Sequence, residues 1–556
     1  MSKGFKISLA VLAIITLGLS SVSMTVNADD QNIDVYLDGK KLMFDVPPVI
    51  SSGRVMVPLR GISEAMGAQV IWESSGLAGA GHVTLSMQKT ETYAFFTIND
   101  PLMTYGYHDD GSAITGGGSS KEITLDTPPV LVNGRVLVPL RAVSEGLGAN
   151  VVWDEKIRSV SITSPVPSKA YTAARGANDF AFKLSASLAK QAADKNMVCS
   201  PYSVWMPLAA LVNVSADPYR EQVLKTLGAA GLSGEDMNRA ASRMLYDLTM
   251  QRDKGYSAEY GTPYNNPLKI ANGIFISQNL TLNKDFAQKF KDFYQGDCPA
   301  VDFNSQNAVN AVNQWAGEHT DGLITNLVNE FDPNTVAAAV NAIYFSNRWQ
   351  REFNENETTD KPFHAPSGDT NARFMLREGD NQVYYEDEKL QAMPLSFKTS
   401  GGMYILLPKD GNAAGLLESM NMEYLERIQA DSTPYATGKL LLPRFSIESG
   451  SMDLKSILSA MGIPLFDSKN APLTGLVEEK IPVWLSGALQ KAVIHVDEKG
   501  TTAAAVTIMP AAGAGLPPEP TKRFEMVCDK PFVFVLFQPT WDGGMQVLFT
   551  GMVYKP

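Results

Sequence analysis

One short segment constrains this chain more than any other. The run from Gly500 to Gly515 carries no charge, no aromatic ring and little bulk. An exposed loop normally contains charged and turn-forming residues, and such an alanine-rich run is equally unusual as a strand. A segment that is a mobile loop in one state and a buried strand in another needs small side chains that fit between existing strands. Composition alone is equally compatible with an Ala/Gly linker.

The first part of the chain contains an internal repeat. Residues 47–73 and 128–154 match at most positions without gaps, at an offset of 81 residues. The pattern predicts two small α+β units that together form one module. In the second copy, its elements are a hairpin turn at 133–134, a strand at 135–138, a helix whose apolar face holds Leu140, Val143 and Leu147, and a strand at 151–153.

These paired units resemble the N-terminal domain of copper amine oxidases, a module that many secreted bacterial proteins also carry. Copper in those enzymes needs a histidine cluster. This region has only His82 and His108, which are not in ligand spacing, so we expect neither a metal nor a cofactor. The stretch 108–121 is expected to be an exposed loop rather than a calcium site. We interpret the module as a spacer or surface-attachment unit, with a purely structural role as the alternative.

The first 28 residues have the layout of a signal peptide. Lys3 and Lys6 precede an apolar run at 7–19, and small residues at 26–28 offer a cleavage site. A retained membrane anchor is the alternative, but the run is shorter than the roughly 20 residues that span a bilayer. We therefore expect a secreted or cell-surface protein with no membrane span in its mature form.

Charge and cysteine content exclude further classes. The formal charge is -12 and the pI is near 5.1, whereas a nucleic-acid-binding protein normally presents a basic surface. The three cysteines are far apart and odd in number. A disulfide framework is therefore not expected, although a single bridge stays open.

Residues 165–169 are interpreted as a stiff, proline-containing linker. The module is assigned to 29–164, after the signal peptide at 1–28, and one large domain to 170–556. Helical patterns come first in the large domain, and β-branched or aromatic segments come later, which predicts an α+β architecture with large sheets. The expected helices lie at 178–193, 202–212 and 307–318, and the expected strands at 336–345, 403–407, 440–447 and 532–537.

No motif of a known enzyme class occurs in the chain. HExxH, G-x-S-x-G, the Walker loop and paired CxxC are all missing from the sequence. His495 lies in an alternating apolar stretch before Asp497, where a structural role fits better than that of a general base. We expect a protein that is not an enzyme and needs no cofactor.

The sequence around the uncharged run resembles the reactive-centre loop of the serpins. EKGTTAAA, from Glu498 to Ala505, is similar to the hinge of inhibitory serpins, and LPPE from Leu516 supports the same register. Further matches occur in order over nearly all of 175–556. They are Asn178-Asp179-Phe180-Ala181-Phe182, Ser200-Pro201-Tyr202-Ser203, Asn313-Gln314-Trp315, the run from Asn341 to Trp349, Leu442-Pro443-Arg444-Phe445, Asp529-Lys530-Pro531-Phe532 and Phe549-Thr550-Gly551.

The resemblance implies the serpin fold, which has three β-sheets, surrounding helices and an exposed reactive-centre loop. It also implies residue roles. The bond that a target protease attacks falls between Ala514 and Gly515. A histidine often stands where this chain has Gln490, so whether the sheet opens as easily stays open. The implied hinge comprises Glu498, Gly500, Thr501, Ala503, Ala504 and Ala505, and the implied sheet-opening cluster comprises Ser200, Ser203, Asn341, Gln490 and Trp349. An ordinary core position is equally compatible with the sequence around Trp349.

By the same resemblance, the chain is a suicide inhibitor of serine proteases. The cut loop inserts into the main sheet while the protease stays attached as an acyl-enzyme. Pro510 cannot donate a strand hydrogen bond and weakens insertion slightly. Small residues at 511–514 favour elastase-like or subtilisin-like targets. Alternation predicts that the residues facing the core after insertion are Thr501, Ala503, Ala505, Thr507, Met509 and Ala511.

Three alternatives accompany this hypothesis. A non-inhibitory serpin could serve as a surface or binding protein, but the hinge at 501–505 lacks the charge or bulk that such relatives tend to carry. An enzyme with an unrecognised site is disfavoured by the missing motifs. A cysteine protease could attack the same bond. The expected partners are a target protease and, through the module, a cell surface.

Overall fold

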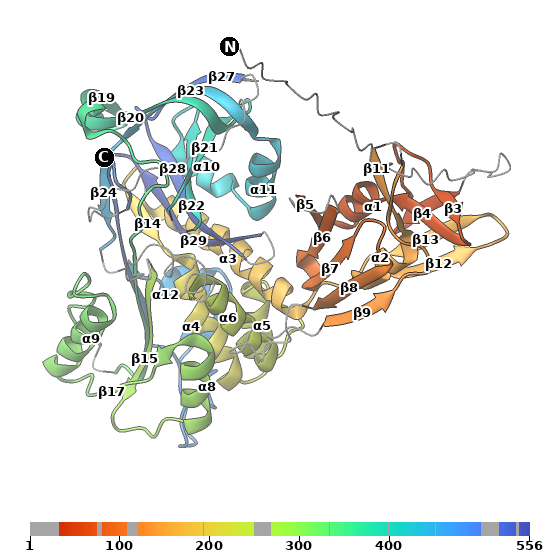
Figure 1. Ribbon diagram of the computed structural model, residues 1–556. Coiled ribbons are helices and arrows are strands. Elements are labelled where there is room, and N and C mark those ends of the chain that lie inside the picture. The colour runs from red at the N-terminus through yellow and green to blue at the C-terminus, as the bar shows by residue number, and fades with distance from the viewer. Residues whose placement is uncertain are drawn as a thin grey trace, which may run out of the picture.

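The computed structural model describes residues 33–74, 81–107, 120–132, 134–192, 194–249, 268–332, 334–398, 400–450, 452–501, 522–540 and 544–556. It has two parts, a small module on one side and a larger α+β body on the other (Figure 1). Residues 164–168 contain no helix or strand and lead directly into helix α3 of the larger body.

The two sequence repeats form the centre of the module. The first copy contributes β3 (Val49–Ser51), β4 (Arg54–Pro58) and α1 (Leu59–Met66), and the second contributes β10 (Val130–Val132), β11 (Arg135–Pro139) and α2 (Leu140–Gly146). β4 and β11 pair antiparallel, with Val57 opposite Val138. The copies therefore share one sheet, in the order β10-β11-β4-β3, and each buries the apolar face of its helix, as the repeat predicts.

The equivalent strands that follow α1 and α2 enter different sheets. One sheet has the order β5-β6-β7-β8-β9, and the other has the order β12-β13-β1-β2. Their bounds are β5 (Gln69–Ser74), β6 (Gly81–Met87), β7 (Thr92–Thr97), β8 (Leu102–Tyr107), β9 (Ser120–Thr124), β12 (Asn150–Asp154), β13 (Ser159–Thr163), β1 (Asp34–Leu37) and β2 (Lys40–Lys41). The three sheets enclose a core of their own that includes Val57, Val83, Phe96 and Val138.

The larger body begins with helices. α3 starts at Lys169, nine residues before the expected start at Asn178, because Ser168 caps it: the Tyr171 N–H donates to Ser168 Oγ over 2.9 Å. The helices are α3 (Lys169–Ala192), α4 (Pro201–Leu211), α5 (Tyr219–Thr226), α6 (Gly234–Thr249), α8 (Lys284–Tyr294), α9 (Gln306–His319), α10 (Ala413–Ser419), α11 (Met422–Asp431) and α12 (Lys455–Ala460).

Two of the three expected sheets share one long strand. β20 (Gly368–Glu386) pairs with β21 at one end and with β23 along most of its length, and the register shifts between Gly379 and Gln382. The path through the described strands is therefore continuous, β14-β29-β28-β22-β21-β20-β23-β27, with β19 beside β20. The bounds are β14 (Met197–Cys199), β29 (Met545–Val553), β28 (Phe532–Pro539), β22 (Gly402–Pro408), β21 (Leu390–Ser396), β23 (Thr433–Pro443), β27 (Lys522–Val527) and β19 (Thr359–Ala365).

The remaining sheet runs along the body and carries the candidate site. Its strand order is β16-β15-β18-β26-β24, with β17 beside β15 and β25 beside β26. The expected strand at 440–447 is wrong as a single element, because the chain leaves β23 at Pro443 and begins β24 in this other sheet at Phe445. The bounds are β16 (Gly296–Asp297), β15 (Leu268–Ser277), β18 (Ala337–Phe345), β26 (Gly487–Val496), β24 (Phe445–Glu448), β17 (Ala300–Val301) and β25 (Met452–Asp453).

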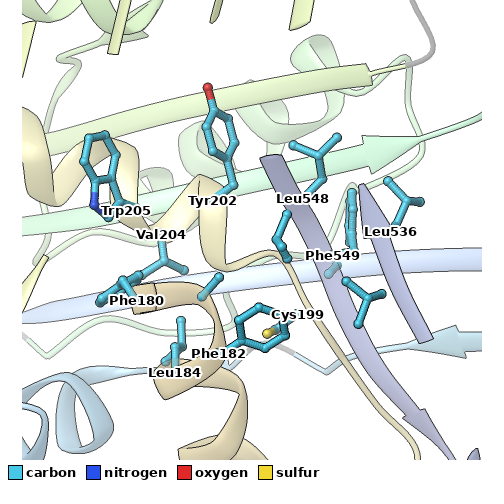
Figure 2. Packing of buried hydrophobic residues seen from close by; sticks show 14 of the residues in the cluster. Phe180, Phe182, Leu184, Cys199, Tyr202, Val204, Trp205, Leu536, Leu548 and Phe549 are labelled. Atoms are coloured by element: carbon cyan, nitrogen blue, oxygen red, sulfur yellow. The ribbon is translucent and has the colours of Figure 1, made fainter. Parts of the chain in front are cut away.

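The main hydrophobic core lies between the N-terminal helices and the C-terminal strands. Figure 2 shows Phe180 and Phe182 of α3 near Trp205 of α4 and Phe549 of β29. Every residue of α4 is buried, which fixes this helix beneath the sheet that contains β18 and β26. Cys199 also lies in this core, and all three cysteines are free, so the single bridge left open by the sequence does not form here.

Candidate functional site

The candidate site begins at the seam between β18 and β26. These strands run parallel, with Asn341 opposite Gln490. On its other side β18 pairs antiparallel with β15, and β26 pairs antiparallel with β24. A strand that follows β26 after a reverse turn would therefore run antiparallel to both β18 and β26. The parallel seam can accept such a strand without reversing any existing pair.

A tight turn at Asp497 to Gly500 reverses the chain after β26. The Asp497 carboxylate accepts hydrogen bonds from the N–H groups of Lys499 and Gly500, over 2.8 and 3.1 Å. Gly500 passes so close to the neighbouring chain that a Cβ there would lie 2.1 Å from the carbonyl oxygen of Asn347. Glycine is therefore required at 500 by close approach of two backbones.

Thr501 already occupies the end of the seam. Gly500 forms an antiparallel bridge with Arg348, and the Thr501 N–H donates to the Asn347 carbonyl over 2.8 Å. The hydroxyl of Thr501 accepts from the Asn347 N–H over 2.8 Å, and the residue is fully buried. The chain thus enters between the continuations of β18 and β26 in the direction that an inserted strand would take.

The turn is held from outside by the segment that follows β18. The Trp349 N–H donates to the Lys499 carbonyl and its Nε1 donates to the Asp497 carbonyl, both over 2.9 Å. The Phe353 N–H donates to the Glu498 carbonyl over 2.8 Å. The Trp349 ring is buried and stacks on Phe397 with ring centroids 4.9 Å apart. Trp349 therefore clamps the hinge rather than the middle of the sheet.

Glu498 anchors the hinge to β24 through a buried ion pair. Its carboxylate, only 2% exposed, accepts from Arg444 Nε over 2.7 Å and Nη2 over 2.6 Å, and from the Thr358 hydroxyl. Burial alone would raise the pKa of Glu498, but the hydrogen bonds from Arg444 and Thr358 outweigh burial and hold the pKa below its usual value. The hinge carboxylate is therefore ionised in the folded protein at neutral pH.

Gln490 connects β26 to the start of α4. Its Nε2 donates to the Ser200 carbonyl over 2.8 Å and to Ser203 Oγ over 2.9 Å. Its Oε1 accepts from the Ser200 N–H over 3.0 Å. All three residues are fully buried, and Ser200 also caps α4. The glutamine amide thus satisfies both donor and acceptor groups of the helix end.

The amino-acid sequence matches a known family over most of its length. Residues 175–556 match the serpin (serine protease inhibitor) sequence profile, and residues 36–162 match that of the copper amine oxidase N-terminal domain. The chain belongs to the serpin family. An alpha-1-antiproteinase of Callosciurus caniceps is 30% identical to this serpin over 385 residues, which cover 68% of this chain and 87% of the relative.

Solved structures of other serpins have the same fold. Human glycosylated kallistatin covers 70% of this chain and 99% of its own, at 26% identity and a TM-score of 0.59. Human thyroxine-binding globulin, solved in complex with thyroxine, gives the same TM-score at 23% identity, and at that identity the likeness shows the fold alone. The expected fold, a serpin body preceded by a small α+β module, is therefore confirmed.

The expected sheet-opening cluster of this serpin does not form one hydrogen-bonded group: Gln490 bonds toward α4, and Asn341 bonds toward β15. Ser200, Ser203 and Gln490 bond to one another, as described. Asn341 lies opposite Gln490, but its Nδ2 donates away from the seam, to the Ala271 carbonyl over 3.1 Å and to Asn272 Oδ1 over 2.9 Å. Its own Oδ1 is buried without a hydrogen-bond partner among the described residues. Asn341 therefore strengthens the contact of β18 with β15.

Several site residues were missed at the sequence level. Arg444, Asn347 and Asn272 each bond to an expected site residue, yet none was assigned a role. The signal for Asn272 is a polar side chain inside the apolar segment 270–276, which predicts a buried hydrogen bond. Arg444 gives a weaker signal, because it stands inside a stretch that looks like one continuous strand.

Part of the expected site lies outside the described residues. Ala503, Ala504, Ala505 and the bond between Ala514 and Gly515 all belong to 502–521, as does Pro510. The expected signal peptide lies outside them as well. Among the described residues, no group of His, Cys, Asp or Glu side chains could hold a metal ion. None of the described helices is long and apolar enough to cross a membrane.

Proposed function

We propose that this serpin is a single-use inhibitor of serine proteases, cut between Ala514 and Gly515. The observation that carries the proposal is the position of Thr501. It bonds to Asn347, just beyond the end of β18, at the only described parallel seam that adjoins the hinge. The resemblance to inhibitory hinges and the uncharged sequence from Thr501 onward point in the same direction.

The chemistry follows from the acyl-transfer mechanism of the target. The protease serine attacks the carbonyl carbon of Ala514, the bond to the Gly515 nitrogen breaks, and the amine leaves with a proton. The serpin then remains bound to the protease through an ester at Ala514. Hydrolysis of that ester needs an intact protease active site, which insertion of the loop would pull out of shape.

The free energy released by loop insertion is large enough to distort a protease domain. Insertion replaces one parallel seam, with seven aligned pairs, by two antiparallel seams. The net gain is at least one seam of hydrogen bonds, on the order of ten kcal/mol at roughly 1 kcal/mol per bond. A typical protease domain is stable by about 5–15 kcal/mol. Loop insertion can therefore distort the trapped enzyme.

The finer parts of the proposal rest on sequence alone. Small residues at 511–514 suit proteases with shallow primary pockets, such as elastase-like or subtilisin-like enzymes. The signal-peptide layout of residues 1–28 supports secretion. The resemblance of residues 29–164 to a module of secreted bacterial proteins supports attachment to a cell surface. A non-inhibitory role, the alternative, requires that the hinge stop at Thr501 and that cleavage bring no gain in stability.

The direct experiment mixes the full chain with a panel of elastase-like, subtilisin-like and trypsin-like proteases. We expect a denaturant-resistant complex with the first two classes, and release of a peptide that begins at Gly515, identified by mass spectrometry. Ala514→Arg should move complex formation to the trypsin-like enzyme, because a deep acidic pocket binds that charge. Ala512→Arg is the matched control, since it places the same charge two residues away from the cut.

A cut at any other bond contradicts the register, and cleavage without a complex by every enzyme contradicts the inhibitory function.

A further inference from the structure

A buried arginine with no acidic partner lies beside the segment that clamps the hinge. Arg377 on β20 is only 8% exposed. Its Nη2 donates to the carbonyl oxygen of Arg351, and its guanidinium lies over the Phe353 ring at 4.3 Å. Its Nε is buried and has no hydrogen-bond partner among the described residues. A buried charge normally has an ion-pair partner, because desolvation without one is costly.

A second arginine stands next to it. Arg351 Nη2 donates to the backbone carbonyl of Glu378 over 2.8 Å. Neither arginine takes part in a salt bridge within the described residues. Burial and the positive charge of Arg351 together lower the pKa of Arg377 to about 10. The two like charges therefore repel each other, and no described carboxylate forms an ion pair with either of them.

Both arginines line one pocket. Its volume is 320 Å³, and its other lining residues are Glu352, Asn354, Glu357, Leu376 and Glu378. Glu352 is already paired with Arg348 over 2.6 Å. The pocket thus combines a deep, uncompensated positive charge with carboxylates around it.

We propose that this pocket binds one small oxyanion, such as sulfate or phosphate, between Arg351 and Arg377. Guanidinium groups form the strongest charge-assisted hydrogen bonds with such anions, and a bound anion would compensate the buried charge. The surrounding glutamates repel additional negative charge, so the site selects a single compact anion over an extended polyanion.

The anion would act on the hinge through contacts already described. Arg377 holds the Arg351 carbonyl and the Phe353 ring, and the Phe353 N–H holds the Glu498 carbonyl over 2.8 Å. Fixing the two guanidinium groups therefore fixes segment 349–353, whose N–H groups bond to the hinge turn. A ligand in this pocket is a means to regulate how firmly the closed hinge is held.

The first test is calorimetric titration of the full chain with sodium sulfate, sodium phosphate and glucose 6-phosphate, at constant ionic strength set with sodium chloride. We expect saturable binding of one sulfate or phosphate per chain. Arg351→Gln, at an exposed position that need not disturb folding, should weaken binding by about tenfold, the effect of one lost charge-assisted hydrogen bond. Arg373→Gln is the matched control, because Arg373 is an exposed arginine on the same strand as Arg377 and does not line the pocket.

Equal affinity in Arg351→Gln and Arg373→Gln overturns the site, as does the lack of saturable binding. Glucose 6-phosphate that binds as tightly as phosphate supports an anionic group on a larger molecule, and weaker binding supports a free inorganic ion. The titration contains no protease, so its result is independent of the inhibitory function.

The second test measures the link to the hinge. Sulfate should slow hydrogen exchange of the Trp349 and Phe353 amides in the unaltered chain and in Arg373→Gln, but not in Arg351→Gln. Sulfate that binds without any change in these two amides overturns the proposed connection to the hinge.

Discussion

The two neighbours of β18 differ in direction and in what connects them. Toward β15 the pairing is antiparallel over nine residue pairs, and Asn341 adds side-chain hydrogen bonds across the contact. Toward β26 the pairing is parallel over seven pairs. There Gln490, the register partner of Asn341, bonds instead to Ser200 at the start of α4.

This difference explains where a strand can enter. A chain that turns back after β26 would run antiparallel to both strands only at the parallel seam, and parallel pairing is slightly less stable per residue. Under the proposed function, the β15 contact would hold β18 in place while the β26 side opens. The sheet would then have one permanent seam and one exchangeable seam, and the hinge turn lies at the end of the seam with β26.

The largest expected effect is a gain in stability when the loop is cut. Cleavage after Ala514 should raise the melting temperature by tens of degrees, because insertion contributes on the order of ten kcal/mol and each kcal/mol shifts Tm by a few degrees. An ordinary protein becomes less stable when a loop is cut. Calorimetry on intact and cleaved protein in the same buffer measures the difference. A cleaved form that melts at or below the intact form means that the parallel seam does not open.

A charge at the entrance of the seam should abolish inhibition. Thr501 is fully buried and bonded to Asn347, so Thr501→Arg forces a guanidinium into this space at a cost of several kcal/mol. We expect the protease to cut the loop and leave without forming a complex, as seen on a denaturing gel. Thr502→Arg is the control, since alternation predicts that this side chain faces outward. Full complex yield with Thr501→Arg would falsify insertion at this seam.

The two seams should respond differently to loss of their buried amides. Gln490→Ala leaves the groups at the start of α4 without partners and frees β26. Asn272→Ala removes the hydrogen bond from Asn341 and the one that Asn272 donates to the Tyr294 carbonyl, but no contact at the β26 seam. Loss of the Gln490 hydrogen bonds should lower the free energy needed to open the seam by about 1 kcal/mol. Uptake of a synthetic peptide of residues 501–514 should therefore become about fivefold faster in Gln490→Ala. Asn272→Ala should lower Tm about as much as Gln490→Ala does, but should leave the rate of peptide uptake unchanged. Equal uptake rates in both variants contradict the distinction between the seams.

The hinge could be predicted from the sequence more fully than the residues that surround it. Gly500 and Thr501 stand in a run whose composition is unusual for both loop and strand, and the structure buries Thr501 at the end of the seam. By contrast, the direction in which Asn341 bonds depends on the register with a strand about 70 residues earlier, which no local pattern specifies. Arg444 was missed because residues 440–447 look like one continuous strand, so the exit of the chain from one sheet into another at Pro443 was not recognised.

Acid should loosen the hinge through Glu498. Its pKa in the folded protein lies below the usual value of 4.5, so its contribution to stability is complete above pH 4.5 and is lost as pH falls through the lower native pKa. Tm is measured from pH 7 to 3, and below pH 4.5 it should fall less steeply in Glu498→Gln than in the unaltered chain. The difference corresponds to up to about one proton fewer taken up on unfolding. Glu525→Gln is the control for loss of a carboxylate, because its ion pair with Lys439 is exposed and contributes little to stability. Identical slopes in all three proteins contradict the anchoring role.

The smallest expected effect comes from removal of the module. The module contacts the body near the start of α3, where the Ser168 N–H donates to the Lys89 carbonyl over 2.6 Å. The hinge contacts described here come instead from 347–358 and Arg444, far along the chain from the module.

A shortened chain that begins at Pro167 keeps Ser168 and therefore the cap of α3. Its rate of association with the protease should stay within about twofold of the full chain, because neither the seam nor the hinge loses a contact. Loss of the contact between Lys89 and Ser168 should change Tm by only a few degrees. Stopped-flow measurement of complex formation gives the rate. A loss of tenfold or more, with the gain in Tm on loop cleavage preserved, would show that the module binds the protease itself. A loss of both would show instead that the module supports the sheet, and the two seams would then no longer be a property of the serpin body alone.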